Sequence, residues 1–155
     1  MRAQDLMTTP VVTCHVNDTL ARAAQLMWDH DCGAIAVVRD DGHLAGMVTD
    51  RDICMATFTQ GLAPSAILVN SAMSQHVVAA HADSAVRDIE SLMAERQVRR
   101  IPIVDDEDRP IGVISFNDIA REAVRPTSQL KQGVPRVMQT LAAICRPRTS
   151  SRRAA

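Results

Sequence analysis

The chain has 155 residues and a formal net charge of −1, a length that allows one compact domain or two small intertwined halves. Aromatic residues make up 2% of the chain, which disfavours ring stacking on single-stranded nucleic acid, and no apolar run is long enough to span a bilayer. Residues 1–120 carry 9 basic and 17 acidic side chains, whereas residues 121–155 carry 8 basic and one acidic. We expect an acidic body with a basic tail, and a cytoplasmic protein, because the first residues are not of signal-peptide type.

The first half of the chain predicts a strand, a helix, two strands and a second helix. The predicted elements are Val11–Cys14, Leu20–His30 with Asn17 or Asp18 as its cap, Ala34–Val38, Ala45–Thr49, and a helix from Asp50 that stops at Gly61. The helix assignments rest on apolar residues at helical spacing, and the Ala34–Val38 strand rests on a continuous apolar run. Gly61 is a typical residue for ending a helix.

The second half predicts the same order of elements. They are the strand Val77–Ala79, a helix from Ser84 to Gln97, the strands Ile101–Val104 and Ile111–Ser115, and the helix Phe116–Val124. The fold class is therefore α/β (α+β), with two β-α-β-β-α units. Past Pro126, the segment Val134–Ile144 predicts a short amphipathic helix that packs on the rest of the chain or on a partner.

The two halves are copies of each other. When the sequence is shifted by 66 residues, segment 5–53 aligns with 71–119 without a gap, and 12 of 49 positions are identical. A unit of about 50 residues buries little surface alone, so we expect the copies to face each other across a pseudo-twofold axis, with one shared core and two related clefts. The predicted organisation is a first copy over 1–60, a linker over 61–70, a second copy over 71–124 and a C-terminal extension over 125–155.

Each copy carries a polar motif where a strand meets a helix. Thr49-Asp50-Arg51-Asp52 in the first copy matches Ser115-Phe116-Asn117-Asp118 in the second. Unpaired N–H groups at a helix start favour anions, and a carboxylate in the first turn can accept hydrogen bonds from both hydroxyls of a ribose. Taken singly, each motif is explained as well by helix capping. Its recurrence at the same place in both copies favours a ligand site.

With this motif, the stretch Val98-Arg99-Arg100-Ile101-Pro102-Ile103-Val104-Asp105 and the ungapped repeat, residues 5–123 resemble a pair of CBS domains, or Bateman module. The whole chain is similar to stand-alone two-CBS proteins of bacteria, including those of the hypoxic-response type. The resemblance implies a regulatory module that binds an adenine nucleotide (AMP, ADP, ATP or a related adenosyl ligand) between the copies. It also implies a homodimer that signals to an unknown protein partner.

The resemblance assigns residues to two clefts. In the first, Asp118 would hold the ribose with Ser115 and Asn117 beside it, and Arg99 and Arg100 would lie nearby. The adenine would lie against Met7, Val12, Cys32 and Gly33. In the second, Asp52 would hold the ribose with Thr49 and Arg51 beside it, and Met73 and Val78 would lie against the base. Arg99 and Arg100 would face the phosphates, since Arg is suited to that anion. The alternative is that these arginines only pair with the acidic surface.

The copies differ where phosphate should lie, because Arg99 and Arg100 align with Gly33 and Ala34. We therefore predict that the Asp118 cleft binds phosphate-bearing ligands more tightly than the Asp52 cleft. The rival hypothesis is a structural or protein-interaction dimer whose clefts are closed by Met and Val side chains. Nucleic-acid binding through the basic residues 146–155 is a weaker, third hypothesis.

Nothing in the sequence indicates an enzyme, an obligatory cofactor or a metal site. No Ser or Cys nucleophile has a paired base in a recognisable motif, and no glycine-rich phosphate loop occurs. The four cysteines form no Cys-x-x-Cys pair, so we expect reduced structural thiols. Trp28, the only tryptophan, lies late in the first long helix, where the resemblance places a dimer face, and is expected to anchor that interface.

Overall fold

The computed structural model describes residues 1–123, 125 and 134–144. The first copy contains β1 (Thr13–His15), α1 (Leu20–Asp29), β2 (Ala34–Val38), β3 (Leu44–Thr49) and α2 (Asp50–Gln60). The second contains β4 (Ala80–His81), α3 (Val86–Arg96), β5 (Arg100–Val104), β6 (Pro110–Ser115) and α4 (Phe116–Ala123), and α5 (Val134–Ile144) follows. The predicted α+β class and the β-α-β-β-α order of both copies are confirmed.

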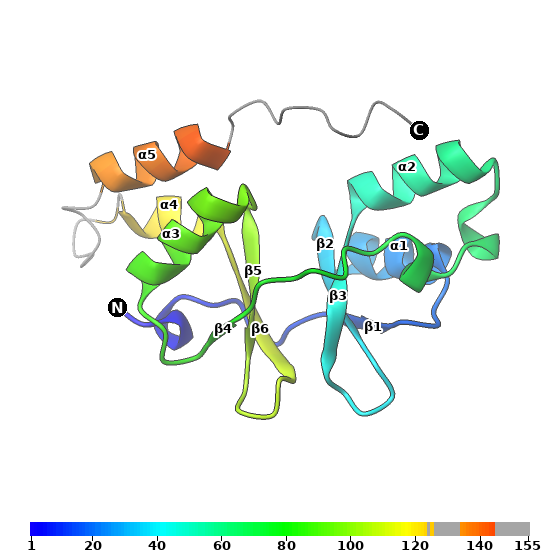
Figure 1. The fold of residues 1–155 in the computed structure, drawn as a ribbon, viewed down its shortest axis with the longest axis horizontal. Coiled ribbons are helices and arrows are strands. Elements are labelled where there is room, and N and C mark those ends of the chain that lie inside the picture. The colour runs from blue at the N-terminus through cyan, green and yellow to red at the C-terminus, as the bar shows by residue number, and fades with distance from the viewer. Residues whose placement is uncertain (124, 126–133, 145–155) are drawn as a thin grey trace.

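Each copy forms its own three-stranded sheet with the same pairing. β2 lies between β1, which runs parallel to it, and β3, which runs antiparallel; β5 lies in the same way between β4 and β6. Even the irregularities recur, since the register shifts between Val37 and Val38 in one sheet and between Ile103 and Val104 in the other. Figure 1 shows the two halves side by side, with both β-hairpins at one end and the helices at the other.

Two local predictions were wrong at the edges of elements. The cap of α1 is Thr19, whose side chain accepts a hydrogen bond from the Arg22 N–H at 3.2 Å, while Asp18 accepts from the His15 N–H and closes the preceding turn. The first strand of each copy also begins later than predicted, at Thr13 and Ala80. Pairing with the central strand determines where these strands begin, and it outweighs the preference of the preceding valines for strand structure.

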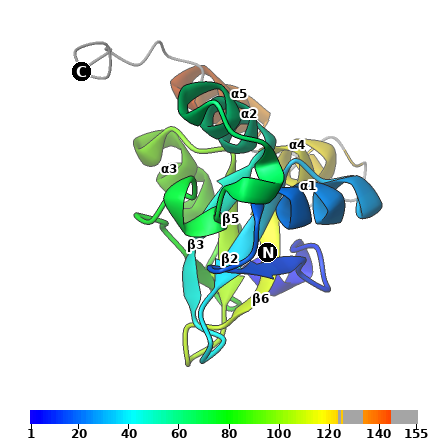
Figure 2. The same ribbon diagram turned by 90° about the vertical axis from the view of Figure 1, so that its right-hand side faces the viewer.

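The segments before β1 and β4 are exchanged between the copies. The Ala3 N–H donates to the Ser84 carbonyl at 2.8 Å, and Thr8 pairs with Val113 of β6. In return, residues 67–74 run along the first copy, where Ser74 pairs with Met47 of β3. Both crossings are visible in Figure 1 and, turned by 90°, in Figure 2. Each copy is therefore completed by a strip of chain from the other.

The buried residues form two clusters, so the expectation of one shared core is wrong. One cluster contains Ala3 with the second copy, and the other contains Ile67 and Val69 with the first. Ile67 and Val69 belong to the segment predicted as a linker, yet they are 2% and 0% exposed. Each exchanged strip supplies the apolar surface that a copy lacks, and this gives each copy a closed core of its own.

Cys14 lies in the core of the first copy, and Cys32 and Cys54 are also free thiols. Burial, together with the negative charge of Asp18, raises the pKa of the Cys14 thiol to about 11. The thiol therefore stays protonated near neutral pH and packs as a small apolar group. Within the described ranges, no helix is long and apolar enough to cross a bilayer.

Candidate functional site

Asp118 is a buried carboxylate in the first turn of α4. Its Oδ2 accepts hydrogen bonds from the N–H and the hydroxyl of Ser115, the last residue of β6, and the Asp118 N–H donates back to the Ser115 hydroxyl at 3.3 Å. Its Oδ1 accepts from Arg121. Asp118 is 9% exposed, whereas the Arg121 side chain is 77% exposed. The capping bonds fix the carboxylate, and only its partner Arg121 is free to move away.

A cavity of about 390 Å³ opens beside this carboxylate. It is lined by Leu6, Thr8, Asp118, Arg121, Glu122 and Arg125. Leu6 and Thr8 come from the exchanged strip of the first copy, and the rest come from α4 and from Arg125, two residues beyond its end. Arg125 also donates to Glu122 at 2.9 Å. The Asp118 cavity therefore lies between the copies, and it contains two carboxylates and two guanidinium groups.

Asp52 has the same local structure in the first copy. Its Oδ2 accepts from the Thr49 N–H at 2.9 Å and from the Thr49 hydroxyl at 2.7 Å, and its own N–H donates to that hydroxyl at 3.2 Å. The positions equivalent to Arg121, Glu122 and Arg125 are Met55, Ala56 and Thr59. The Asp52 side thus repeats the hydroxyl and the carboxylate but replaces the charged side chains with uncharged ones.

Met7 and Met73 pack across the boundary onto the strands of the opposite copy. A Cβ on Gly112 would lie 2.6 Å from the Met7 Sδ, and one on Gly46 would lie 2.9 Å from the Met73 Sδ. Both glycines are three residues before the hydroxyl residue of the motif. Glycine is needed there because the backbone of one copy closely approaches the other. Val12 and Val78 follow these methionines and are half-buried.

The arginines named from the sequence lie outside the lining of the Asp118 cavity. Arg99 is exposed, and its carbonyl accepts from the Phe116 N–H at 2.8 Å. The Arg100 Nη2 lies 3.4 Å from the position that a Cβ would take on Gly33, so this side chain reaches the first copy. Arg51 and Asn117 are exposed in the first turns of their helices.

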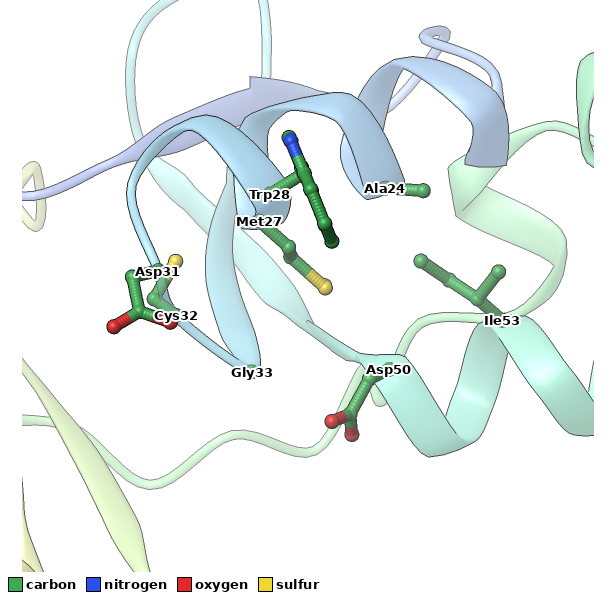
Figure 3. A pocket seen from close by; sticks show the side chains of 8 residues that line it. All are labelled: Ala24, Met27, Trp28, Asp31, Cys32, Gly33, Asp50 and Ile53. Atoms are coloured by element: carbon green, nitrogen blue, oxygen red, sulfur yellow. The ribbon is translucent and has the colours of Figure 1, made fainter.

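Cys32 and Gly33 line a different cavity, of about 420 Å³, between α1 and α2 of the first copy. Its lining is Ala24, Met27, Trp28, Asp31, Cys32, Gly33, Asp50 and Ile53 (Figure 3). The sequence reasoning also missed Leu6, Thr8, Arg121, Glu122 and Arg125. The signal for the arginines was present in the sequence: Arg121 follows Asp118 by three residues, and Arg125 follows Arg121 by four, which are the spacings of neighbours on one helix face.

The sequence profile of the CBS domain matches residues 3–58 and 69–125, and the chain belongs to this family. Among curated relatives, the CBS domain-containing protein YhcV of Bacillus subtilis is 41% identical over 117 residues, covering 76% of this chain and 81% of its own length. Hypoxic response protein 1 of Mycobacterium tuberculosis is 32% identical over 145 residues, covering 94% of each chain.

Solved structures of CBS domain pairs share the fold. The CBS domain pair of protein MJ0100, in complex with 5′-methylthioadenosine and S-adenosyl-L-methionine, gives a TM-score of 0.71 at 26% identity and covers 78% of this chain and 94% of its own. Hypoxic Response Protein I, with two coordinated zinc ions, gives 0.71 at 34% identity and covers 78% and 98%. In the described part of the present chain, no group of three or more His, Cys, Asp or Glu side chains is placed to hold a metal ion.

Proposed function

We propose that this chain is a non-catalytic regulatory module that binds an adenine nucleotide, or a related adenosyl ligand, in the Asp118 cavity. The observation that supports it is a buried carboxylate, oriented by Ser115 at the boundary between the copies, with two arginines in the same lining. A carboxylate fixed in this way accepts both hydroxyls of a ribose without reorganising, and arginine matches the geometry of phosphate. The related MJ0100 pair binds two adenosyl ligands.

The two clefts would differ in what they bind. Beside Asp118, Arg121 and Arg125 supply positive charge to a phosphate, whereas the first copy has Met55 and Thr59 there. The predicted preference of the Asp118 cleft for phosphate-bearing ligands therefore stays a proposal, but with α4 and Arg125 supplying the cations in place of Arg99 and Arg100. The proposed contacts for the base remain Met7 and Val12 in the Asp118 cleft, and Met73 and Val78 in the Asp52 cleft.

Ligand binding would act on a partner protein by changing how the two copies are arranged relative to each other. The cavity has walls from both copies, so a ligand that bridges them favours one arrangement over others. The protein partner would read that arrangement, in the cytoplasm. The rival function, an interaction module without a ligand, is favoured by one observation: Asp118 already has a partner on each carboxylate oxygen.

The experiment is thermal unfolding with AMP, ADP, ATP and S-adenosylmethionine, followed by calorimetry on two matched variants. A ligand at 100 times its Kd stabilises the folded protein by roughly 2.7 kcal/mol. Asp118→Ala and Asp52→Ala remove the same capping box from α4 and α2, so their effects on stability are comparable. We expect Asp118→Ala to weaken AMP binding about tenfold or more, and Asp52→Ala to leave this site intact.

Two results would contradict the proposal. If none of the four ligands raises the unfolding temperature, the rival interaction module is correct. If both alanine variants lose the same amount of AMP affinity, the clefts are equivalent, and the proposed role of Arg121 and Arg125 is wrong.

A second prediction concerns Arg121, which occupies the carboxylate oxygen that a ribose needs. Arg121→Ala should leave adenosine binding unchanged or make it tighter, because the competing partner is gone. The same change should weaken AMP binding several-fold, because a cation near the phosphate is lost. Calorimetry with adenosine and with AMP gives the change in affinity for each ligand. An equal loss for adenosine and AMP would show that Arg121 only supports the fold of α4.

A further inference from the structure

Helix α4 has two faces with different surroundings. One face carries Asp118, Arg121 and Glu122, which line the Asp118 cavity. The other face carries Ile119 and Ala123, which are fully buried in the core of the second copy. At about 100° per residue, these two groups lie on opposite sides of the helix. The charged wall of the cavity is therefore held in position by the apolar contacts on the other side of α4.

Helix α5 supplies part of these apolar contacts, since it lies against α3 and α4 (Figure 1). Val137 of α5 is 5% exposed and belongs to the same core cluster as Ile119 and Ala123. Leu141 and Ile144, further along α5, pack against that cluster. Helix α5 therefore adds apolar surface to the core that supports α4, although it contributes no residue to the cavity lining.

Two polar contacts fix the direction of α5. Arg136, near the start of α5, donates to the Oε2 of Glu90 in α3 at 2.6 Å. The side-chain amide of Gln97, just after α3, donates to the carbonyl of Ala143 near the end of α5 at 3.2 Å. The two helices therefore run parallel, with a buried ion pair at one end and a hydrogen bond at the other. Such contacts give α5 one defined docked position.

The first copy shows how α4 differs from its counterpart α2. The shift of 66 residues relates Ala123, the last residue of α4, to Thr57, yet α2 continues to Gln60. Helix α4 has eight residues and α2 has eleven. A shorter helix has less stability of its own, so α4 depends more on its neighbours. In the described part of the chain, the charged cavity, the shorter helix and the covering helix all occur in the second copy.

We propose that the docking of α5 and the order of the Asp118 cavity are coupled through α4, so that α5 is the element that responds to a ligand in this cavity. The response to a ligand rests on the proposed function. When α5 leaves, α4 loses apolar contacts, and the apparent affinity falls with the fraction of molecules in which α5 is docked. Because linkage is reciprocal, the ligand favours docked α5 by the same factor. A partner protein would then distinguish covered from uncovered α3.

Hydrogen exchange of the α5 amides tests the coupling without any ligand. Asp118→Ala and Asp52→Ala remove the same capping box from α4 and from α2, so they form a matched pair. We expect Asp118→Ala to speed the exchange of α5 several-fold through local opening. Asp52→Ala should leave it close to the wild-type rate, because α2 belongs to the other core. Equal exchange of α5 in the two variants would overturn the proposal.

AMP tests the coupling in the other direction. Saturating AMP should slow the exchange of α5 in the wild-type chain more than the exchange of α2. The double variant Arg136→Glu with Val137→Asp places two carboxylates on the docked face of α5 and should release the helix. We expect it to weaken AMP binding about tenfold in calorimetry. Met138→Asp, on the outer side of α5 where Met138 is 59% exposed, is the matched control and should leave AMP affinity unchanged.

The outcomes separate this proposal from the proposed function. Unchanged AMP affinity in the double variant, with fast exchange showing that α5 is released, would overturn the coupling. If circular dichroism shows that the double variant does not fold, the wild-type chain decides, and unchanged α5 exchange in saturating AMP is the contradicting result. If AMP does not bind the wild-type chain, the proposed function and the response of α5 to a ligand are both wrong. The comparison of Asp118→Ala with Asp52→Ala then still decides whether α4 couples the cavity to α5.

Discussion

Replacing Arg136 by alanine is expected to lower the free energy of unfolding by about 3 kcal/mol, because it leaves a buried carboxylate without its charged partner. The Glu90 side chain is 1% exposed, and its Oε1 has no hydrogen-bond partner within the described residues. The hydrogen bond from Arg136 at 2.6 Å is therefore the interaction that offsets the cost of burying this carboxylate. Urea unfolding of wild type and variant measures the loss.

The control for this prediction comes from the first copy, where Ala24 takes the place of Glu90. In a Glu90→Ala background, Arg136→Ala should cost little, because no buried charge remains to be paired. Arg109→Ala is a second control: it breaks ion pairs with Asp105 and Glu107 on the surface and should change stability little. If Arg136→Ala were no more harmful than Arg109→Ala, the buried pair would have no special role.

Gly46→Ala is expected to be the most harmful of the single-methyl additions, at about 3 kcal/mol, by overpacking. The new Cβ would lie 2.6 Å from the Ser74 carbonyl oxygen. That carbonyl accepts from the Met47 N–H, and the Ser74 N–H donates to the Met47 carbonyl at 2.8 Å. The strip cannot move aside without losing both hydrogen bonds.

Gly112→Ala provides the matched comparison, since the nearest atom to its Cβ is the Met7 Sδ, part of a flexible side chain. We expect a smaller loss of about 1 kcal/mol. In a Met7→Ala background, Gly112→Ala should become nearly neutral, whereas Met73→Ala should not rescue Gly46→Ala. Chemical denaturation measures the free energy of unfolding lost on each glycine substitution, with and without the methionine substitution. An equal rescue at both glycines would mean that the backbone contact at Gly46 is unimportant.

The order of elements could be predicted because each copy repeats its apolar pattern, and two weak signals that agree are stronger than one. The positions of Asp52 and Asp118 were found for the same reason. The exchange of segments 1–8 and 67–74 could not be seen, because a local pattern does not show which copy a segment contacts. The predicted linker was therefore thought to be only a connection, although Ile67 and Val69 are core residues.

The cavity was predicted less well than the carboxylate that it contains. Arg99 and Arg100 were assigned to the phosphates by resemblance, and they have no counterparts in the first copy. The same comparison between the copies, carried through α4 to residue 125, points to Arg121 and Arg125. Those arginines lie beyond the segment 71–119, which is the part of the second copy that aligns with the first. Cys32 and Gly33 were assigned to the adenine by resemblance, and the structure shows them along α1 and α2 instead.

The exchanged strips also determine how the chain loses its structure. Ala3 is buried in the core of the second copy, and the chain that follows it leads into β1 of the first copy. Unfolding of the first copy would therefore remove apolar side chains that the core of the second copy needs. We therefore expect the two cores to unfold together as one cooperative unit and not as two independent domains. A small molecule held at one edge can therefore strengthen parts of the protein that it never touches.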